Sequence, residues 1–189
     1  MSNKVVLVHG YNKSQRDMKA LQNNLEKLGY EGILVDLPLT FKEVKECNLI
    51  FKEKMEQIIF NLAKDEEINL VGHSTGGLVI RSFLSSTMHT AQINRAVLIS
   101  TPNQGSKLAE LAVRLMSGLV NIFKTLKSLQ LVKIKELGLD KESRIEVGAI
   151  AGNNNNLLLG NLLKEENDGR VQVSAVRYEG LTDFIVIPY

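Results

Sequence analysis

The chain has 189 residues, of which 44% are hydrophobic, and this is enough to build one sizeable hydrophobic core. The formal net charge of +2, without a long run of Lys or Arg, excludes the strongly basic surface that a nucleic-acid-binding protein needs. No apolar run is long enough to span a bilayer, and the single cysteine, Cys47, cannot form an internal disulfide. We therefore expect one soluble, cytoplasmic domain over residues 1–189.

The first half of the chain alternates short apolar runs with helical patterns. The runs at 5–8 and 33–35 predict buried strands, and a helix capped by Ser14 and stopped by Gly29 lies between them. A second helix is predicted from Thr40, where Thr40-Phe41-Lys42-Glu43 has the form of a capping box, to about residue 63. Cys47 lies on the apolar face of that helix and is therefore expected to be a packing residue.

The next strand, 68–71, runs directly into Gly72-His73-Ser74-Thr75-Gly76-Gly77, and a helical pattern follows. Gly-x-Ser-x-Gly between a strand and a helix is typical of a nucleophile elbow, in which side chains at the glycine positions would collide with the neighbouring strand and helix. A loop of small residues is the alternative interpretation. The strand before the motif and the helix after it favour the elbow, so Ser74 is the candidate nucleophile.

The second half of the chain continues with predicted strands at 96–99, 145–150 and 184–187. Between the first two of these, residues 107–141 carry leucines at helical spacing, with seven Lys or Arg against three Asp or Glu. We expect this segment to be a helical cap that covers an acyl chain or makes peripheral contact with an anionic lipid surface. Ordinary packing of its first helix on the sheet is the alternative.

Six strands separated by helices predict an α/β fold with a mostly parallel sheet. The loops at the carboxyl ends of such strands form the functional site. Here they contain His9-Gly10-Tyr11, Asp36, residues 101–106 and Asp168. They provide no cluster of His, Cys or carboxylate side chains, so we expect neither a metal nor a cofactor.

These loops resemble those of the lipase-like α/β-hydrolases, both the minimal bacterial lipases and the group related to GPI inositol-deacylases. The resemblance spans nearly the whole chain and rests on four motifs: His9-Gly10, the elbow around Ser74, Thr101-Pro102 with Gly105-Ser106, and Asn167-Asp168-Gly169. It implies a three-layer α/β-hydrolase fold with a helical cap insertion.

The resemblance also assigns roles to residues. It makes Ser74 the nucleophile and Asp168 the acid, with the backbone N–H groups of Tyr11 and Thr75 as the oxyanion hole. Gly10 and His73 are expected beside them in the substrate site. Asp-Gly is also an ordinary turn pair, which is the alternative for Asp168, whereas Asp36 precedes the elbow and is given a role in capping a loop.

A base for the serine is missing from this pattern. The sequence has three histidines, His9, His73 and His89, and none follows Asp168. In the resembled family the catalytic histidine lies in the loop after the last strand, so we expect that the sequence is truncated just before this loop. An inactive homologue is the main alternative, and a base from His9 or a partner chain is a minor one.

The function predicted is therefore a serine carboxylic-ester hydrolase, of the esterase or lipase class, that forms an acyl-enzyme on Ser74. The expected substrate is a small acyl ester or a lipid, with no nucleic-acid partner. The alternatives are a non-catalytic module that binds a small molecule or lipid in the same pocket, and a thioesterase or acyltransferase. The sequence does not indicate an oligomeric state.

Overall fold

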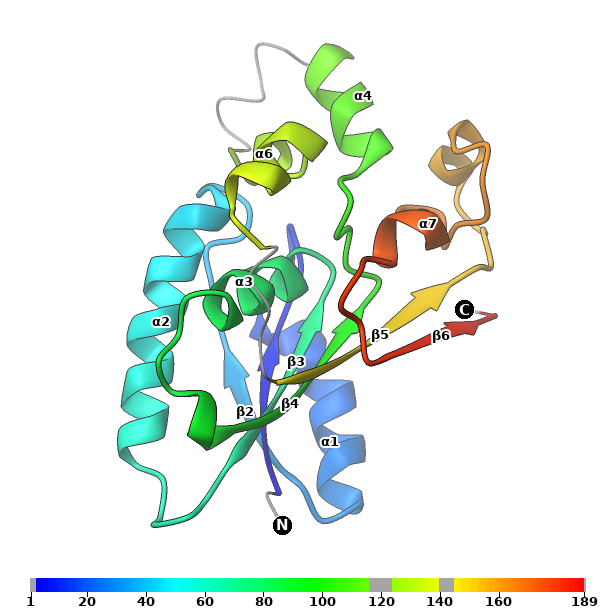
Figure 1. Cartoon of the computed structure of the whole chain (residues 1–189). Helices are drawn as coiled ribbons and strands as arrows, with labels where there is room; N and C mark the ends of the chain where they lie inside the picture. Colours follow the sequence, from blue (N-terminus) through cyan, green and yellow to red (C-terminus); the bar gives the residue numbers. More distant parts are fainter. Residues whose placement is uncertain (1–2, 116–123, 140–144, 189) are drawn as a thin grey trace.

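The computed structural model describes residues 3–115, 124–139 and 145–188, and six strands in it form one parallel sheet (Figure 1). The order is β2-β1-β3-β4-β5-β6, and every neighbouring pair is parallel. The strands are β1 (Lys4–Val8), β2 (Glu31–Val35), β3 (Ile68–His73), β4 (Ile93–Ile99), β5 (Glu146–Gly152) and β6 (Asp183–Ile187). All six predicted strands are confirmed, and several extend beyond their predicted bounds.

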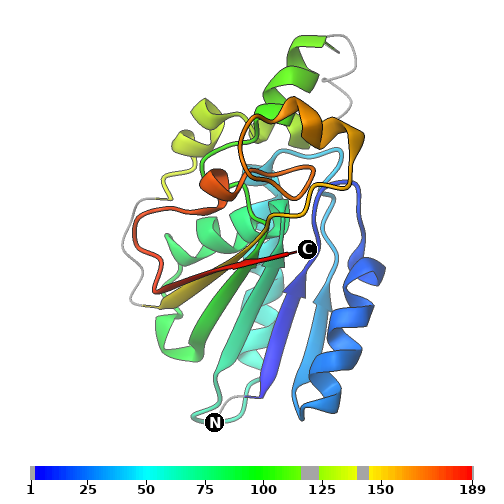
Figure 2. The same ribbon diagram turned by 90° about the vertical axis from the view of Figure 1, so that its right-hand side faces the viewer.

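Helices cover both faces of the sheet and complete the predicted three layers (Figures 1 and 2). The 3-10 turn η1 (Gln15–Met18) and α1 (Lys19–Lys27) pack on one face, and α2 (Val44–Phe60) and α3 (Thr75–Leu84) pack on the other. Ser14 caps η1 as predicted, because its side chain accepts a hydrogen bond from the Arg16 N–H. The chain thus has the α/β-hydrolase fold class.

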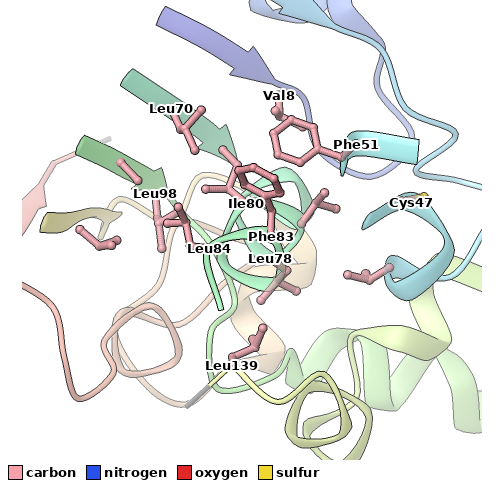
Figure 3. Packing of buried hydrophobic residues seen from close by; sticks show 14 of the residues in the cluster. Val8, Cys47, Phe51, Leu70, Leu78, Ile80, Phe83, Leu84, Leu98 and Leu139 are labelled. Atoms are coloured by element: carbon pink, nitrogen blue, oxygen red, sulfur yellow. The ribbon is translucent and has the colours of Figure 1, made fainter. Parts of the chain in front are cut away.

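The larger part of the core lies between the sheet and the helices α2 and α3 (Figure 3). Phe51 and Phe83 meet there edge to face, with 5.3 Å between ring centroids. Cys47 is completely buried in the same cluster, and burial raises the pKa of its thiol to about 12. The thiol is therefore protonated, and Cys47 is a packing residue as predicted.

The predicted start of α2 is wrong. The helix begins at Val44, and Glu43 rather than Thr40 forms the capping box, with Glu46 as its partner. Thr40 instead belongs to a turn in which the Pro38 carbonyl accepts its backbone N–H at 2.8 Å. The helix ends at Phe60, three residues before the predicted end.

The predicted cap contains three described helices above the carboxyl edge of the sheet: α4 (Lys107–Leu115), α5 (Lys124–Ser128) and α6 (Leu131–Glu136). Residues 116–123 and 140–141 of the predicted cap lie outside the described residues. The helix α5 is attached to the start of α2, because Thr125 Oγ1 donates to the Lys42 carbonyl and Val44 N–H donates to Ser128 Oγ.

Three short elements between the strands were not predicted. They are η2 (Thr90–Gln92), η3 (Leu158–Leu162) and α7 (Val173–Val176). None of the helices described in residues 3–188 is long and apolar enough to cross a membrane.

Candidate active site

Ser74 stands on a sharp turn between β3 and α3. Its backbone has φ 51° and ψ −123°, a conformation that residues with a Cβ rarely adopt. Two hydrogen bonds hold the turn: Ser74 N–H donates to the Ile99 carbonyl at 2.8 Å, and Gly77 N–H donates to the Ser74 carbonyl at 3.0 Å. The strand, turn and helix expected of a nucleophile elbow are therefore present around Ser74.

The glycines around Ser74 allow close approach of backbone to backbone. A Cβ on Gly72 would lie 2.6 Å from Gly77 Cα, which no relaxed structure tolerates. A Cβ on Gly76 would fall on the carbonyl oxygens of Val8 and His9 at the end of β1. The elbow packs this tightly only because both positions lack a side chain.

Two backbone N–H groups lie next to the elbow without an acceptor among the described residues, those of Tyr11 and Thr75. Thr75 is the first residue of α3, where helix geometry leaves the N–H unpaired and the helix dipole is positive. The Tyr11 loop touches the elbow, because a Cβ on Gly10 would be 3.0 Å from Ser74 Cβ. Burial raises the pKa of the Tyr11 phenol, so its ring is neutral at neutral pH.

Asp168 lies in a turn between β5 and β6. Its Oδ1 accepts the N–H groups of Arg170 at 2.9 Å and Val171 at 2.8 Å. Its Oδ2 has no hydrogen-bond partner in the described part of the chain, so this oxygen can accept the N–H of an imidazole. Asp168 therefore stabilises a turn, as the Asp-Gly pair suggested, and its second carboxylate oxygen is still able to accept a hydrogen bond.

A cavity of about 290 Å³ joins the predicted site residues. It is lined by Gly10, Tyr11, His73, Ser74 and Asp168. Leu108, Leu126 and Leu129 of the predicted cap line it as well. Thr75 is fully buried beneath Ser74 and does not line the cavity. The volume of the cavity is close to the lower end of the range for small-molecule sites, about 300–1,000 Å³.

None of the three histidines forms a hydrogen bond with Ser74. His9 is fully buried, its Nδ1 lies 2.9 Å from the Gly10 carbonyl, and Leu37 N–H donates to its Nε2 at 3.1 Å. Both ring nitrogens are thus engaged by neighbouring loop groups, and neither faces Ser74. His9 is thus a loop-packing residue.

The other acceptor near His9 is Asp36, whose Oδ1 lies 3.2 Å from Nε2. The same carboxylate oxygen accepts the Gln15 N–H at 2.8 Å, at the start of η1, so Asp36 caps a loop as predicted.

Neither His73 nor His89 lies where a catalytic base would have to lie, within hydrogen-bond distance of Ser74 Oγ. His73 lines the cavity, and burial, the largest effect, lowers the pKa of its ring, which is therefore neutral at neutral pH. His89 precedes the amino end of β4, whereas Ser74 lies at the carboxyl edge of the sheet. A strand of this length separates the two edges by about 20 Å.

A second, wider cavity of about 620 Å³ adjoins the first between η1 and the ends of the strands. His73 and Asp168 line both cavities, and Ile99, Ile150 and Ile187 at the carboxyl ends of β4, β5 and β6 line the second. Two cations that the sequence did not reveal as site residues, Lys13 and Arg170, also line both cavities. The available signal was their closeness in sequence to the predicted site motifs, because Lys13 follows His9-Gly10-Tyr11 by two residues and Arg170 follows Asn167-Asp168-Gly169 directly.

Arg81 of α3 is a further residue that the sequence did not reveal. Its guanidinium donates to Asn103 Oδ1 at 3.1 Å and to the Leu139 carbonyl at 3.3 Å, and lies 3.5 Å from the centre of the Tyr178 ring. Asn103 in turn donates to the Val176 carbonyl at 2.6 Å. This network connects the elbow helix with the loop after β4 and with α7.

Solved structures similar to the chain come from lipases and esterases. The mature form of Bacillus licheniformis lipase BlEst2 is 25% identical, with a TM-score of 0.81 over 99% of this chain and 84% of that one. Its propeptide form is 24% identical with a TM-score of 0.86, and the chain spans 46% of its length. The metagenomic carboxyl esterase MGS0156 is 17% identical with a TM-score of 0.77, over 98% of this chain and 62% of that one.

These likenesses confirm the α/β-hydrolase fold, whereas a relation to the minimal lipases or the GPI inositol-deacylases stays a prediction. No curated protein matches the sequence. The family model that matches is described as a domain of unknown function, DUF7379, and it matches residues 52–177, from α2 through the elbow to α7. Because this is more than half of the chain, the protein belongs to the DUF7379 family.

Proposed function

We propose that the protein is a serine hydrolase that cleaves carboxylic esters through an acyl-enzyme on Ser74. The observation that carries this proposal is the strained elbow conformation of Ser74 at a cavity that Asp168 also lines. The lipases and esterases with similar structures support the same class of reaction.

The proposed reaction has two steps that share one geometry. Ser74 Oγ attacks the ester carbonyl while an imidazole takes its proton, and the N–H groups of Tyr11 and Thr75 hold the oxyanion. The imidazolium, paired with Asp168 Oδ2, then gives the proton to the departing alcohol, which leaves the acyl group on Ser74. Water activated by the same imidazole releases the carboxylic acid and restores the serine.

We propose that the imidazole comes from a histidine following β6 at the end of the domain. Ile187 at the end of β6 lines the wider cavity together with His73 and Asp168, so a histidine carried after β6 would be close to Asp168. A tryptic peptide of the natural protein that extends past Tyr189 and contains histidine would support this source.

Turnover of a matched set of esters and thioesters tests the proposed function. We expect the 189-residue chain to hydrolyse p-nitrophenyl esters slowly, and with added imidazole to hydrolyse them faster than the same imidazole solution without protein, because imidazole can replace a missing base. Ester turnover above thioester turnover separates an esterase from a thioesterase. Binding of the ester without turnover, with and without imidazole, would contradict the proposal and favour the binding module.

The role of Asp168 is tested by its replacement with asparagine. Asp168→Asn keeps an oxygen for the N–H groups of Arg170 and Val171, so the turn survives, but it removes the charge that orients and stabilises the imidazolium. We expect kcat to fall about 10³–10⁴-fold in a chain that carries the base. Asp183→Asn, at the start of β6, is the control and should keep full turnover. Equal rates for both variants would make Asp168 only a turn residue.

We also propose that residues 107–141 are the cap of the acyl pocket. Leu108, Leu126 and Leu129 line the cavity beside Ser74, and Leu129 and Ile134 are buried in the core. Removal of the whole segment would therefore expose the core, and a point substitution is a better test of the pocket than trimming.

A larger side chain at Leu108 is expected to shorten the preferred acyl chain. Leu108→Trp adds volume to the cavity wall, so kcat/KM for an octanoyl ester should fall about tenfold relative to an acetyl ester, by the loss of apolar contacts. Leu49→Trp on the exposed side of α2, where Leu49 is 61% exposed, is the matched control. An unchanged chain-length profile in Leu108→Trp would count against the cap.

The outer surface of the same segment is proposed to contact lipid. Val132 of α6 is 68% exposed, and Lys135 one turn later on the same helix is exposed, as are Lys124 and Lys127 of α5. An apolar side chain among lysines suits the interface of an anionic lipid layer.

A further inference from the structure

We propose that Arg170 binds an anionic group of the substrate, so that the preferred esters carry a carboxylate or a phosphate close to the scissile bond. The inference rests on the proposed function and narrows its substrate class. Arg170 lines both the cavity that contains Ser74 and the wider cavity beside it. It is therefore within the space that a bound ester would occupy.

The charges around the cavity leave Arg170 as the cation without a partner. Lys13 Nζ lies 3.1 Å from Asp17 Oδ1, and the Ser14 N–H donates to the same carboxylate at 2.9 Å. These contacts, the Ser14 hydrogen bond first, lower the pKa of Asp17, so this carboxylate is ionised and neutralises Lys13. Among the described residues, no carboxylate lies within ion-pair distance of the Arg170 guanidinium.

Asp168 is the other carboxylate of the cavity, and its Oδ1 accepts two backbone N–H groups. It forms no ion pair with the Arg170 guanidinium among the described residues. An anion that enters the cavity therefore meets a Lys13–Asp17 pair and a guanidinium that no carboxylate of the described residues holds. Once the imidazole has taken the Ser74 proton, the imidazolium balances the charge of Asp168, and Arg170 is then the unbalanced cation of the cavity.

The backbone that carries Arg170 is held in place. Its own N–H donates to Asp168 Oδ1, and Gly169 before it has a φ of +88°, which a residue with a Cβ rarely adopts. Gly169 N–H donates at 2.7 Å to the side chain of Asn167, which is 4% exposed. The acid and the backbone of Arg170 thus belong to one fixed turn, so the exposed guanidinium can reach an anion only within the length of its side chain from Asp168.

The positive charge of Arg170 reaches the elbow. Burial is the main cause of the lowered pKa of His73; the charge of Asp168, the next largest effect, raises this pKa, and the charge of Arg170 lowers it. His73 directly precedes Ser74 in the chain. A guanidinium binds a carboxylate or phosphate through two parallel N–H donors, so an anionic substrate would be oriented as well as attracted.

Matched neutral and anionic esters test the inference. With imidazole present, we expect the chain to prefer p-nitrophenyl hemiglutarate, which has a free carboxylate, over its neutral methyl ester in kcat/KM. Arg170→Gln should lower this preference about tenfold, because one charge-assisted contact in a partly exposed site is lost. Arg170→Lys should lose less, since it keeps the charge. Arg16→Gln, which removes a neighbouring cation outside both cavities, should leave the preference unchanged.

Two further measurements show on which side of the ester the anion lies and distinguish failure of the inference from failure of the proposed function. Preference for lysophosphatidic acid over the monoacylglycerol of the same chain would place the anion on the alcohol side, and the hemiglutarate preference would place it on the acyl side. Calorimetric binding of glutarate and glycerol phosphate to Ser74→Ala needs no turnover, and Arg170→Gln should weaken it about tenfold.

Turnover of neutral esters with unaltered preference and binding in Arg170→Gln would overturn the anion site and leave the esterase proposal intact. Absence of ester turnover together with Arg170-dependent binding would overturn the esterase proposal and support the anion site.

Discussion

Replacing Ser74 by alanine is expected to lower ester turnover by at least about a thousandfold in a chain that carries the base, and to lower the imidazole-supported turnover of the 189-residue chain to the rate of imidazole without protein. The reason is that alanine removes the only atom that can form the acyl-enzyme in the proposed reaction. The measurement is the release of p-nitrophenol from a short-chain ester by purified chain with and without the substitution.

The control for this prediction is Ser85→Ala, at the end of the same helix. Ser85 Oγ donates to the Ser82 carbonyl at 2.9 Å, so the variant loses one hydroxyl from α3 without touching the cavity. Ser85→Ala should retain the turnover of the unchanged chain. Turnover that persists in Ser74→Ala would show that hydrolysis occurs elsewhere on the protein.

Replacing Gly76 by alanine is expected to lower the free energy of unfolding by about 3 kcal/mol or more, because the new methyl group overpacks the core. A Cβ at this position would fall on the carbonyl oxygens of Val8 and His9 at the carboxyl end of β1, a strand that is paired on both sides and so cannot move independently. The backbone would have to shift at the elbow itself. Urea unfolding followed by circular dichroism measures the change.

Gly148→Ala in β5 is the matched control for the elbow glycine. The nearest atom to a Cβ at Gly148 is the Asp183 carbonyl oxygen at 3.9 Å, an ordinary contact distance. We expect a change of less than about 1 kcal/mol there, since a strand tolerates alanine. If Gly76→Ala were as stable as Gly148→Ala, the close packing described for the elbow would be incorrect.

Much of the fold was predictable because strands buried on both faces are continuous apolar runs. The segments 5–8 and 68–71 contain no polar side chain except Asn69, so they read as buried strands without knowledge of their neighbours. The start of α2 was not predictable in the same way. Both Thr40 and Glu43 can cap a helix, but the N–H groups that a Thr40 cap would satisfy already have acceptors. The Lys42 N–H donates to the Pro38 carbonyl, and the Glu43 N–H donates to the Glu46 side chain.

The residues of the candidate site likewise include some that were predictable from local sequence and some that were not. Ser74 was predictable because the elbow is local in sequence, and Asp168 followed from the resemblance to a known order of residues. Lys13 and Arg170 were not found, because a charge becomes part of a site only when the fold brings two loops together. The Arg81 network could not be predicted for the same reason, since Arg81 contacts Asn103 and Tyr178, which are 22 and 97 positions later in the sequence.

The most direct test of the central proposal is covalent labelling with a fluorophosphonate. This reagent phosphonylates a serine that lies in an elbow with an oxyanion hole, and added imidazole should accelerate the reaction. We predict a single adduct, located by peptide mass spectrometry at Ser74, that is absent in Ser74→Ala and preserved in Ser85→Ala. An adduct on another residue, or a folded chain that does not react in the presence of imidazole, would contradict the assignment of Ser74 as the nucleophile.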